Sequence, residues 1–294
     1  MVLIVKEVRN LKTDLSQLNI PEKIQILFNK IKLEHYEELY EEDSDGTVSL
    51  EDTLQEVLIS LSDNNESLTH LRYLWMTLIL TLVVEPTLKY YQPKNLLPKH
   101  IINLIANRFI TIINSSINNT KQYVGEFSTE EFLKAISRNQ SSSIEKEIAN
   151  FQILDEALDV FYNAIKVINY DQSLQSILNI LDDCLEGYAI FPGSYGRREL
   201  FDWWLFDVVP ASYNLLPPKI FYVVEGVKNK EEIRFRQTQL LEKISKEIRF
   251  ALQELASKKH NNYIFSTPSK ISSRLFKKSS KIEYQSKIPK LAYS

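Results

Sequence analysis

The sequence is short of the residues on which β-rich and disulfide-bonded proteins depend. Its 294 residues include 6 glycines, 10 prolines and one cysteine, Cys184. β-rich folds place glycine in many of their turns, so its scarcity favours a helical chain. One cysteine excludes an internal disulfide framework and a multi-cysteine metal site. Within the run LDDCLEGY we expect it to be a small buried residue.

The chain also lacks an apolar run of the length that spans a bilayer. The longest uncharged apolar stretch is YLWMTLILTLVV, at residues 73–84, whereas a spanning helix needs ~20 residues. We interpret this stretch as a buried helix and expect no membrane span. The first residues, MVLIVKEVRNLKTD, show no signal-peptide pattern.

Helical patterns occupy most of the sequence. Apolar periodicity and capping residues predict helices over about 21–40, 50–61, 67–85, 98–117, 142–168, 171–187 and 229–256. A further capping pattern predicts that another helix begins at about residue 128. We expect Pro86 to end one helix and Pro210 to border a loop. Two short apolar segments, YAIF and KIFYVV, favour strands. The predicted fold is therefore mainly α-helical, with a small β element near residues 188–191 and 219–224.

Charge is unevenly distributed along the chain. Residues 258–294 contain nine Lys or Arg and one acid, a balance of +8, in a chain whose net charge is −3, so the rest carries −11. We expect three parts: a helical domain (1–187), a mixed α/β region packed on it (188–257) and a basic, flexible tail (258–294). Such a tail can bind nucleic acid through its cations.

The run EEDSDGTVSLED, residues 41–52, resembles a calcium-binding EF-hand loop. Glu41, Asp43 and Asp45 occupy positions one, three and five, Gly46 the turn, and Asp52 position twelve. Position one is Glu where Asp is the rule, and the short arm of Asp at position twelve disfavours bidentate binding. We interpret the run as an acidic loop between helices and expect no physiological calcium switch.

The stretch YAIFPGSYGRRELFDWWLFDVV, residues 188–209, is the main candidate site. Its glycines predict a sharp turn into a helix, because glycine adopts positive φ without strain. Exposed arginines near tryptophans suit a partner-binding hot spot; alternatively, the tryptophans fill the junction with residues 219–256. The candidate binding residues are Gly193, Tyr195, Gly196, Arg197, Arg198, Glu199, Trp203, Trp204 and Asp207.

Within this stretch, GSYGRREL resembles the glycine turn of the nucleotidyltransferase superfamily. In that superfamily a strand leads into the turn, and an Asp-x-Asp pair then binds two metal ions. The matching positions here are Leu205 and Asp207, so the first carboxylate is missing. The resemblance implies at most a nucleotide binder without turnover, and we expect no cofactor and no metal.

The longer run FPGSYGRRELFDWWLFDVVPASYNLLPP resembles the signature of an uncharacterised family of plastid-encoded red algal proteins, the fifty-fifth of the hypothetical chloroplast reading frames. The resemblance is firmest over residues 188–218. Cyanobacterial relatives are described as carrying a response-regulator receiver domain, whose signature is missing here, so phosphoacceptor chemistry is not carried over. The resemblance implies a soluble stromal protein and supplies no activity.

We therefore expect a non-enzymatic protein that binds a protein partner in regulation or assembly. Two alternatives stay open. One is nucleotide binding at the glycine turn, and the other is nucleic-acid binding through residues 258–294.

Overall fold

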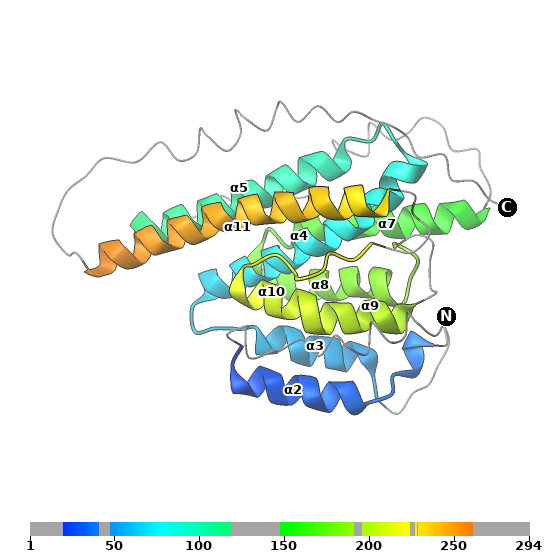
Figure 1. Ribbon diagram of the computed structural model, residues 1–294, viewed down its shortest axis with the longest axis horizontal. Helices are drawn as coiled ribbons and strands as arrows, with labels where there is room; N and C mark the ends of the chain where they lie inside the picture. Colours follow the sequence, from blue (N-terminus) through cyan, green and yellow to red (C-terminus); the bar gives the residue numbers. More distant parts are fainter. Residues whose placement is uncertain are drawn as a thin grey trace.

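The computed structural model describes residues 20–40, 48–118, 148–190, 196–223, 227 and 229–260. Helices pack around one long central helix, α4 (Glu66–Tyr91) (Figure 1). The other elements are α2 (Glu22–Leu33), the 3-10 turn η2 (Glu37–Leu39), α3 (Leu50–Ser60), α5 (Leu97–Asn118), α7 (Ile148–Lys166), α8 (Tyr170–Leu185), α9 (Arg197–Trp203), the π-helical turn η3 (Trp204–Val208), α10 (Val209–Asn214) and α11 (Lys230–His260). The mainly helical prediction is confirmed.

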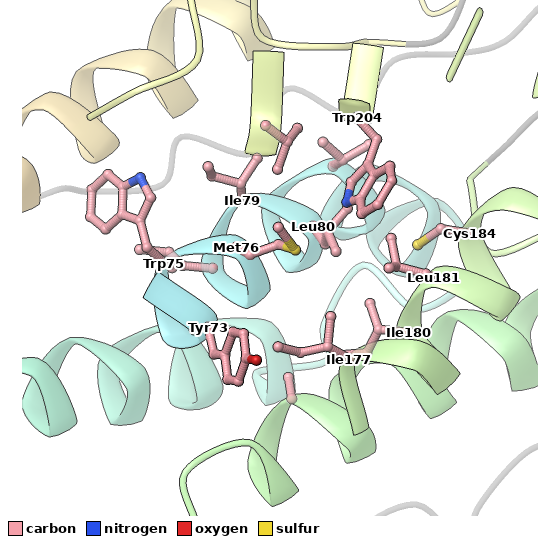
Figure 2. Packing of buried hydrophobic residues seen from close by; sticks show 14 of the residues in the cluster. Tyr73, Trp75, Met76, Ile79, Leu80, Ile177, Ile180, Leu181, Cys184 and Trp204 are labelled. Atoms are coloured by element: carbon pink, nitrogen blue, oxygen red, sulfur yellow. The ribbon is translucent and has the colours of Figure 1, made fainter. Parts of the chain in front are cut away.

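α4 lies at the centre because it is apolar on all sides. Its most apolar window is long enough to cross a membrane, but 89% of that window is buried inside the protein. α5, α7, α8 and α10 take the place that lipid would occupy. Figure 2 shows Trp75 and Ile79 of α4 among buried side chains that include Ile180 of α8 and Trp204 of η3. The predicted buried helix is confirmed.

Prolines do not end the helices where the sequence suggested. α4 runs through Pro86 to Tyr91. The buried carboxylate of Glu85 pairs with Lys89 one turn later and with Arg236 of α11. These contacts hold the helix on both sides of the missing backbone donor. Pro210 follows the π-helical turn η3 directly, inside an uninterrupted helical run over residues 197–214, rather than beside a loop.

The predicted β element is wrong for the part of both segments that the structure describes. Residues 188–190 form a bend and residues 219–223 are irregular. Their backbone groups bind side chains instead of a neighbouring strand: the carbonyl of Ile220, for example, accepts a hydrogen bond from Trp203 Nε1 (2.7 Å). β-propensity depends on a partner strand against which the side chains pack, and these helical surroundings provide none within the described residues.

The ends of two helices also differ from the prediction. α2 ends at Leu33 and an extended residue follows it, so the predicted helix to Tyr40 is broken. α11 continues past the predicted end at Ala256 to His260, alongside α5 (Figure 1). The first residues of the predicted basic tail are therefore helical, and its remainder, residues 261–294, lies outside the described residues.

Candidate functional site

The stretch singled out in the sequence lies where several elements end together. Arg197 begins α9, and its Nη1 donates a hydrogen bond to the carbonyl of Glu38 in η2 (3.4 Å). The carboxylate of Glu38 in turn accepts the backbone N–H of Leu50 at the start of α3 (3.1 Å). The glycine–arginine stretch therefore adjoins the helix that follows the acidic run 41–52. We call the meeting point of α8, α9, η2 and α3 the α8–α9 junction.

Only part of the two predicted sites falls within the described residues. Five candidates lie outside them: Gly193, Tyr195, Glu41, Asp43 and Asp45. Asp52 lies in the first turn of α3, where its backbone N–H donates to the side chain of Ser49 (3.1 Å). Ser49 is thus the N-cap of α3. The described end of the acidic run therefore forms the start of a helix.

The two arginines of the candidate site are structural in position. Arg197 is buried, with 7% of its surface exposed, and its guanidinium lies 5.9 Å from the ring of Tyr188. Arg198 is partly buried; its Nε pairs with Asp202 one turn later (3.1 Å), and its Nη1 donates to the carbonyl of Glu34 (3.4 Å). Both side chains thus join α9 to the chain that follows α2, and neither stands free as an exposed hot spot.

Both tryptophans are buried as well. Trp203 is 7% exposed, donates its indole hydrogen to Ile220 and packs on the ring of Tyr222 at 5.4 Å. Trp204 is fully buried beside Phe201, with ring centroids 5.9 Å apart. This arrangement fits the interpretation in which the tryptophans fill the junction between the helical body and the following segment.

The π-helical turn contains the two positions that the nucleotidyltransferase resemblance matched. Leu205 is fully buried, and Asp207 is 8% exposed with its Oδ1 unpaired among the described residues. Burial raises the pKa of Asp207 to about 6, and nearby Lys219 partly opposes that shift. The described part of the chain contains no group of three or more His, Cys, Asp or Glu residues able to hold a metal ion. The geometry does not provide the metal pair of that superfamily.

Two glycines shape the junction. Gly196 precedes α9 with φ of 100°, the left-handed conformation expected from the sequence. Gly187 is not among the candidate residues predicted from the sequence, although it is packed more tightly than Gly196. A Cβ there would lie 2.7 Å from Glu156 Oε2 and 2.8 Å from the backbone oxygen of Asp183. Its bare backbone lets the Glu156 carboxylate approach and accept the N–H of Tyr188.

Beside the junction, α7 packs along α8, and their facing sides gather acidic side chains. The carboxylate cluster consists of Glu156, Asp159, Asp182, Asp183 and Glu186. Burial, and then the negative charges of Asp159, Asp182 and Glu156, raise the pKa of Asp183 to about 8. Burial and Asp182 raise the pKa of Glu186 to about 7, which Arg197 partly offsets. Asp183 therefore keeps its proton at neutral pH, and the acids around it repel its charge once it ionises.

The sequence contained a signal for this cluster. The acids at 156 and 159, and those at 182, 183 and 186, recur at helical spacing, so each set shares one face of its helix. The spacing alone does not predict that these two faces pack against each other in the fold. Comparison with protein-family models, curated proteins and solved structures finds no match to this chain. Function must therefore be argued from the site itself.

Proposed function

We propose that this chain is a non-enzymatic, partner-binding protein whose carboxylate cluster receives a positively charged segment of a protein partner. The observation that supports this is a cluster of acids on α7 and α8 in which no described cation offsets the raised pKa of Asp183. Oδ2 of Asp183 is buried and unpaired among the described residues, whereas its neighbours Asp159 and Asp182 are exposed. A lysine or arginine of the partner would pair with these exposed carboxylates and stabilise the ionised form of Asp183 beside them.

The proposal replaces the arginine hot spot expected from the sequence with an acidic one. Arg197 and Arg198 hold α9 in place, and so they support the cluster rather than contact the partner. For the compartment we propose the plastid stroma, and for the role regulation or assembly. The resemblance of residues 188–218 to the red algal plastid family supports the proposed compartment and does not bear on the role.

Affinity capture from the native organelle tests the proposal. The bait is the full chain, compared with Asp183→Asn and with Asp171→Asn, a matched control in the exposed first turn of the same helix. We expect Asp183→Asn to lose the partner and the control to retain it. Capture should also be stronger at about pH 8.5 than at about pH 6.5, because a cationic partner binds the ionised carboxylate. Equal capture by all three baits would refute the proposal.

A melting-temperature measurement and capture by a truncated chain separate the two alternatives. Nucleotide binding predicts that a nucleoside triphosphate raises the melting temperature and that Asp183→Asn does not alter this rise. Nucleic-acid binding through the tail predicts loss of capture without residues 258–294 and a steep weakening with salt. A protein partner at the carboxylate cluster should be captured with or without those residues.

A further inference from the structure

A second candidate site shares no lining residue with the carboxylate cluster and contains a cation instead of acids. A cavity of about 450 Å³ opens between the start of α2, the N-terminal part of α4, the end of α10 and α11. This volume is in the range of small-molecule sites. Its walls present polar and apolar surface in similar amounts, and the apolar part includes Leu68, Leu215 and Leu252. One charged side chain, Arg72 of α4, lines it.

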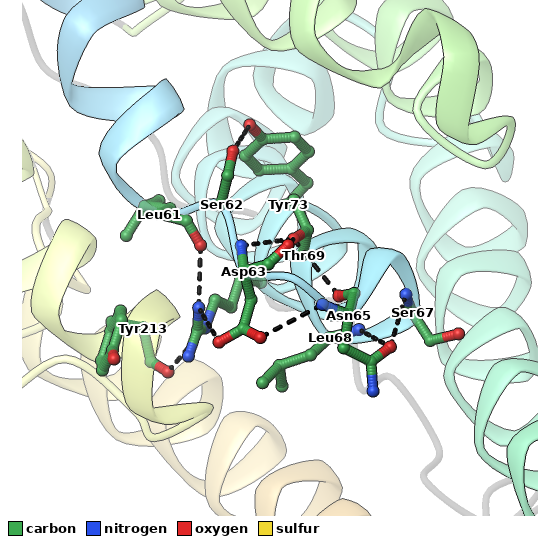
Figure 3. A network of polar contacts seen from close by, with 10 residues as sticks. Leu61, Ser62, Asp63, Asn65, Ser67, Leu68, Thr69, Tyr73 and Tyr213 are labelled. Atoms are coloured by element: carbon green, nitrogen blue, oxygen red, sulfur yellow. Dashed lines mark hydrogen bonds and ion pairs between the residues drawn. The ribbon is translucent and has the colours of Figure 1, made fainter.

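Arg72 is held rigidly at this cavity. It is 5% exposed, and its guanidinium stacks on the ring of Tyr213 at 3.9 Å. Nη1 donates to the carbonyl of Leu61 (2.8 Å) and Nε to the carbonyl of Tyr213 (3.2 Å). Figure 3 draws these hydrogen bonds to Leu61 and Tyr213 together with an ion pair to Asp63. Both hydrogen bonds go to neutral acceptors, and Asp63 is the carboxylate that pairs with the charge of Arg72.

The edge of the guanidinium that carries Nη2 has no hydrogen-bond partner among the described residues. The ion pair with Asp63 uses Nη1, 3.6 Å from Oδ2, and the other oxygen of Asp63 accepts the backbone N–H of Asn65 (3.2 Å), so the pair leaves Nη2 unused. Nη2 of Arg72 makes no hydrogen bond to any residue that the structure describes. A nearly buried cation with a free donor edge, lining a cavity, fits an anion of planar or tetrahedral geometry.

The backbone at the cavity wall is strained. Leu215 has φ of 54°, the one positive φ among the described non-glycine residues. Such a conformation costs of order 1–3 kcal/mol and persists where its surroundings enforce it. Here Ser245 of α11 donates to the carbonyl of Leu215 (2.6 Å), and Trp75 of α4 donates to that of Leu216 (2.7 Å). Helices on both sides therefore hold this turn against the cavity.

We propose that the cavity binds a small amphipathic anion. A carboxylate or phosphate head accepts hydrogen bonds from Nη2 of Arg72, and an apolar body lies against Leu68, Leu215 and Leu252. This site is separate from the carboxylate cluster, so it does not depend on the proposed partner binding.

Calorimetry with defined probes tests the head and the body separately. Octanoate and octyl phosphate supply both parts, with the two head groups in separate titrations. Octanol supplies the body alone, and inorganic phosphate the anion alone. We expect at least one of the two amphipathic anions to bind the full-length protein at least about tenfold more tightly than octanol or phosphate. Absence of binding by both at millimolar concentration, or equally tight binding of octanol, would overturn the proposal.

Two variants locate the binding site. Leu252→Trp fills the cavity without touching the hydrogen bonds of Arg72, and Phe250→Trp adds the same side chain at an exposed position two residues away on α11. We expect Leu252→Trp to weaken the better probe at least about tenfold and Phe250→Trp to leave it unchanged. If Leu252→Trp binds the probe as the wild type does, the probe binds elsewhere and the proposal is wrong.

Discussion

Replacing Asp183 by Asn should make the protein more stable, and increasingly so as the pH rises. The substitution keeps the size of the side chain and removes one negative charge from the carboxylate cluster. Burial and the charges of Asp159, Asp182 and Glu156 raise the pKa of the Asp183 carboxyl from 3.8 to about 8. In the folded chain this carboxyl therefore keeps its proton over a pH range in which the unfolded chain has lost it.

The sign and size of the effect follow from this difference. Between the two pKa values the folded chain binds more protons than the unfolded chain, so the wild type loses stability as pH rises from about 4 to about 8. A gap of about four pKa units sets an upper limit of ~6 kcal/mol. Neighbouring carboxyls can take up the proton instead, and water screens part of the repulsion. We therefore expect the gain from Asp183→Asn to grow by ~2 kcal/mol between about pH 5 and about pH 8.

Urea unfolding followed by tryptophan fluorescence measures this gain at each pH. Asp171→Asn is the control, because Asp171 is exposed in the first turn of the same helix; its difference from the wild type should stay constant over the same range. A gain that is the same at both pH values, or a variant less stable than the wild type at the higher pH, would refute the reasoning. A more stable variant also ensures that lost partner capture does not reflect unfolding.

The remaining predictions concern packing, the arginines and the tail. Trp204→Ala should lower the free energy of unfolding by ~3–5 kcal/mol because it empties a fully buried site, and Gly187→Ala by ~1–3 kcal/mol because its Cβ meets backbone; urea unfolding at neutral pH measures both. Arg198→Ala should cost ~1 kcal/mol or less and Arg197→Ala clearly more, because Arg197 is buried. Equal costs for the two variants would contradict the structure. Limited trypsin digestion should remove residues beyond Lys258 first; early cuts within 148–256 would contradict the predicted boundary.

Local patterns in the sequence determined most of the helices. Periodicity and capping residues are properties of a few neighbouring residues, so α3, α5, α8 and α11 begin close to where the sequence predicts. The same reasoning placed Cys184 in the core, where it is 4% exposed. It also identified residues 73–84 as a buried helix, since a segment that is apolar on all sides needs a covering on all sides.

The tertiary structure alone decided the chemistry of the site. The segments 188–190 and 219–223 have strand-like composition, but helices surround them, and their backbone groups bind side chains instead of another strand. Pro86 stays inside α4 because contacts from α11 support the helix around it. The raised pKa of Asp183 exists only because α7 packs on α8 and brings two separately unremarkable acidic faces together. Which faces meet depends on contacts between residues far apart in the chain, and no local pattern carries that information.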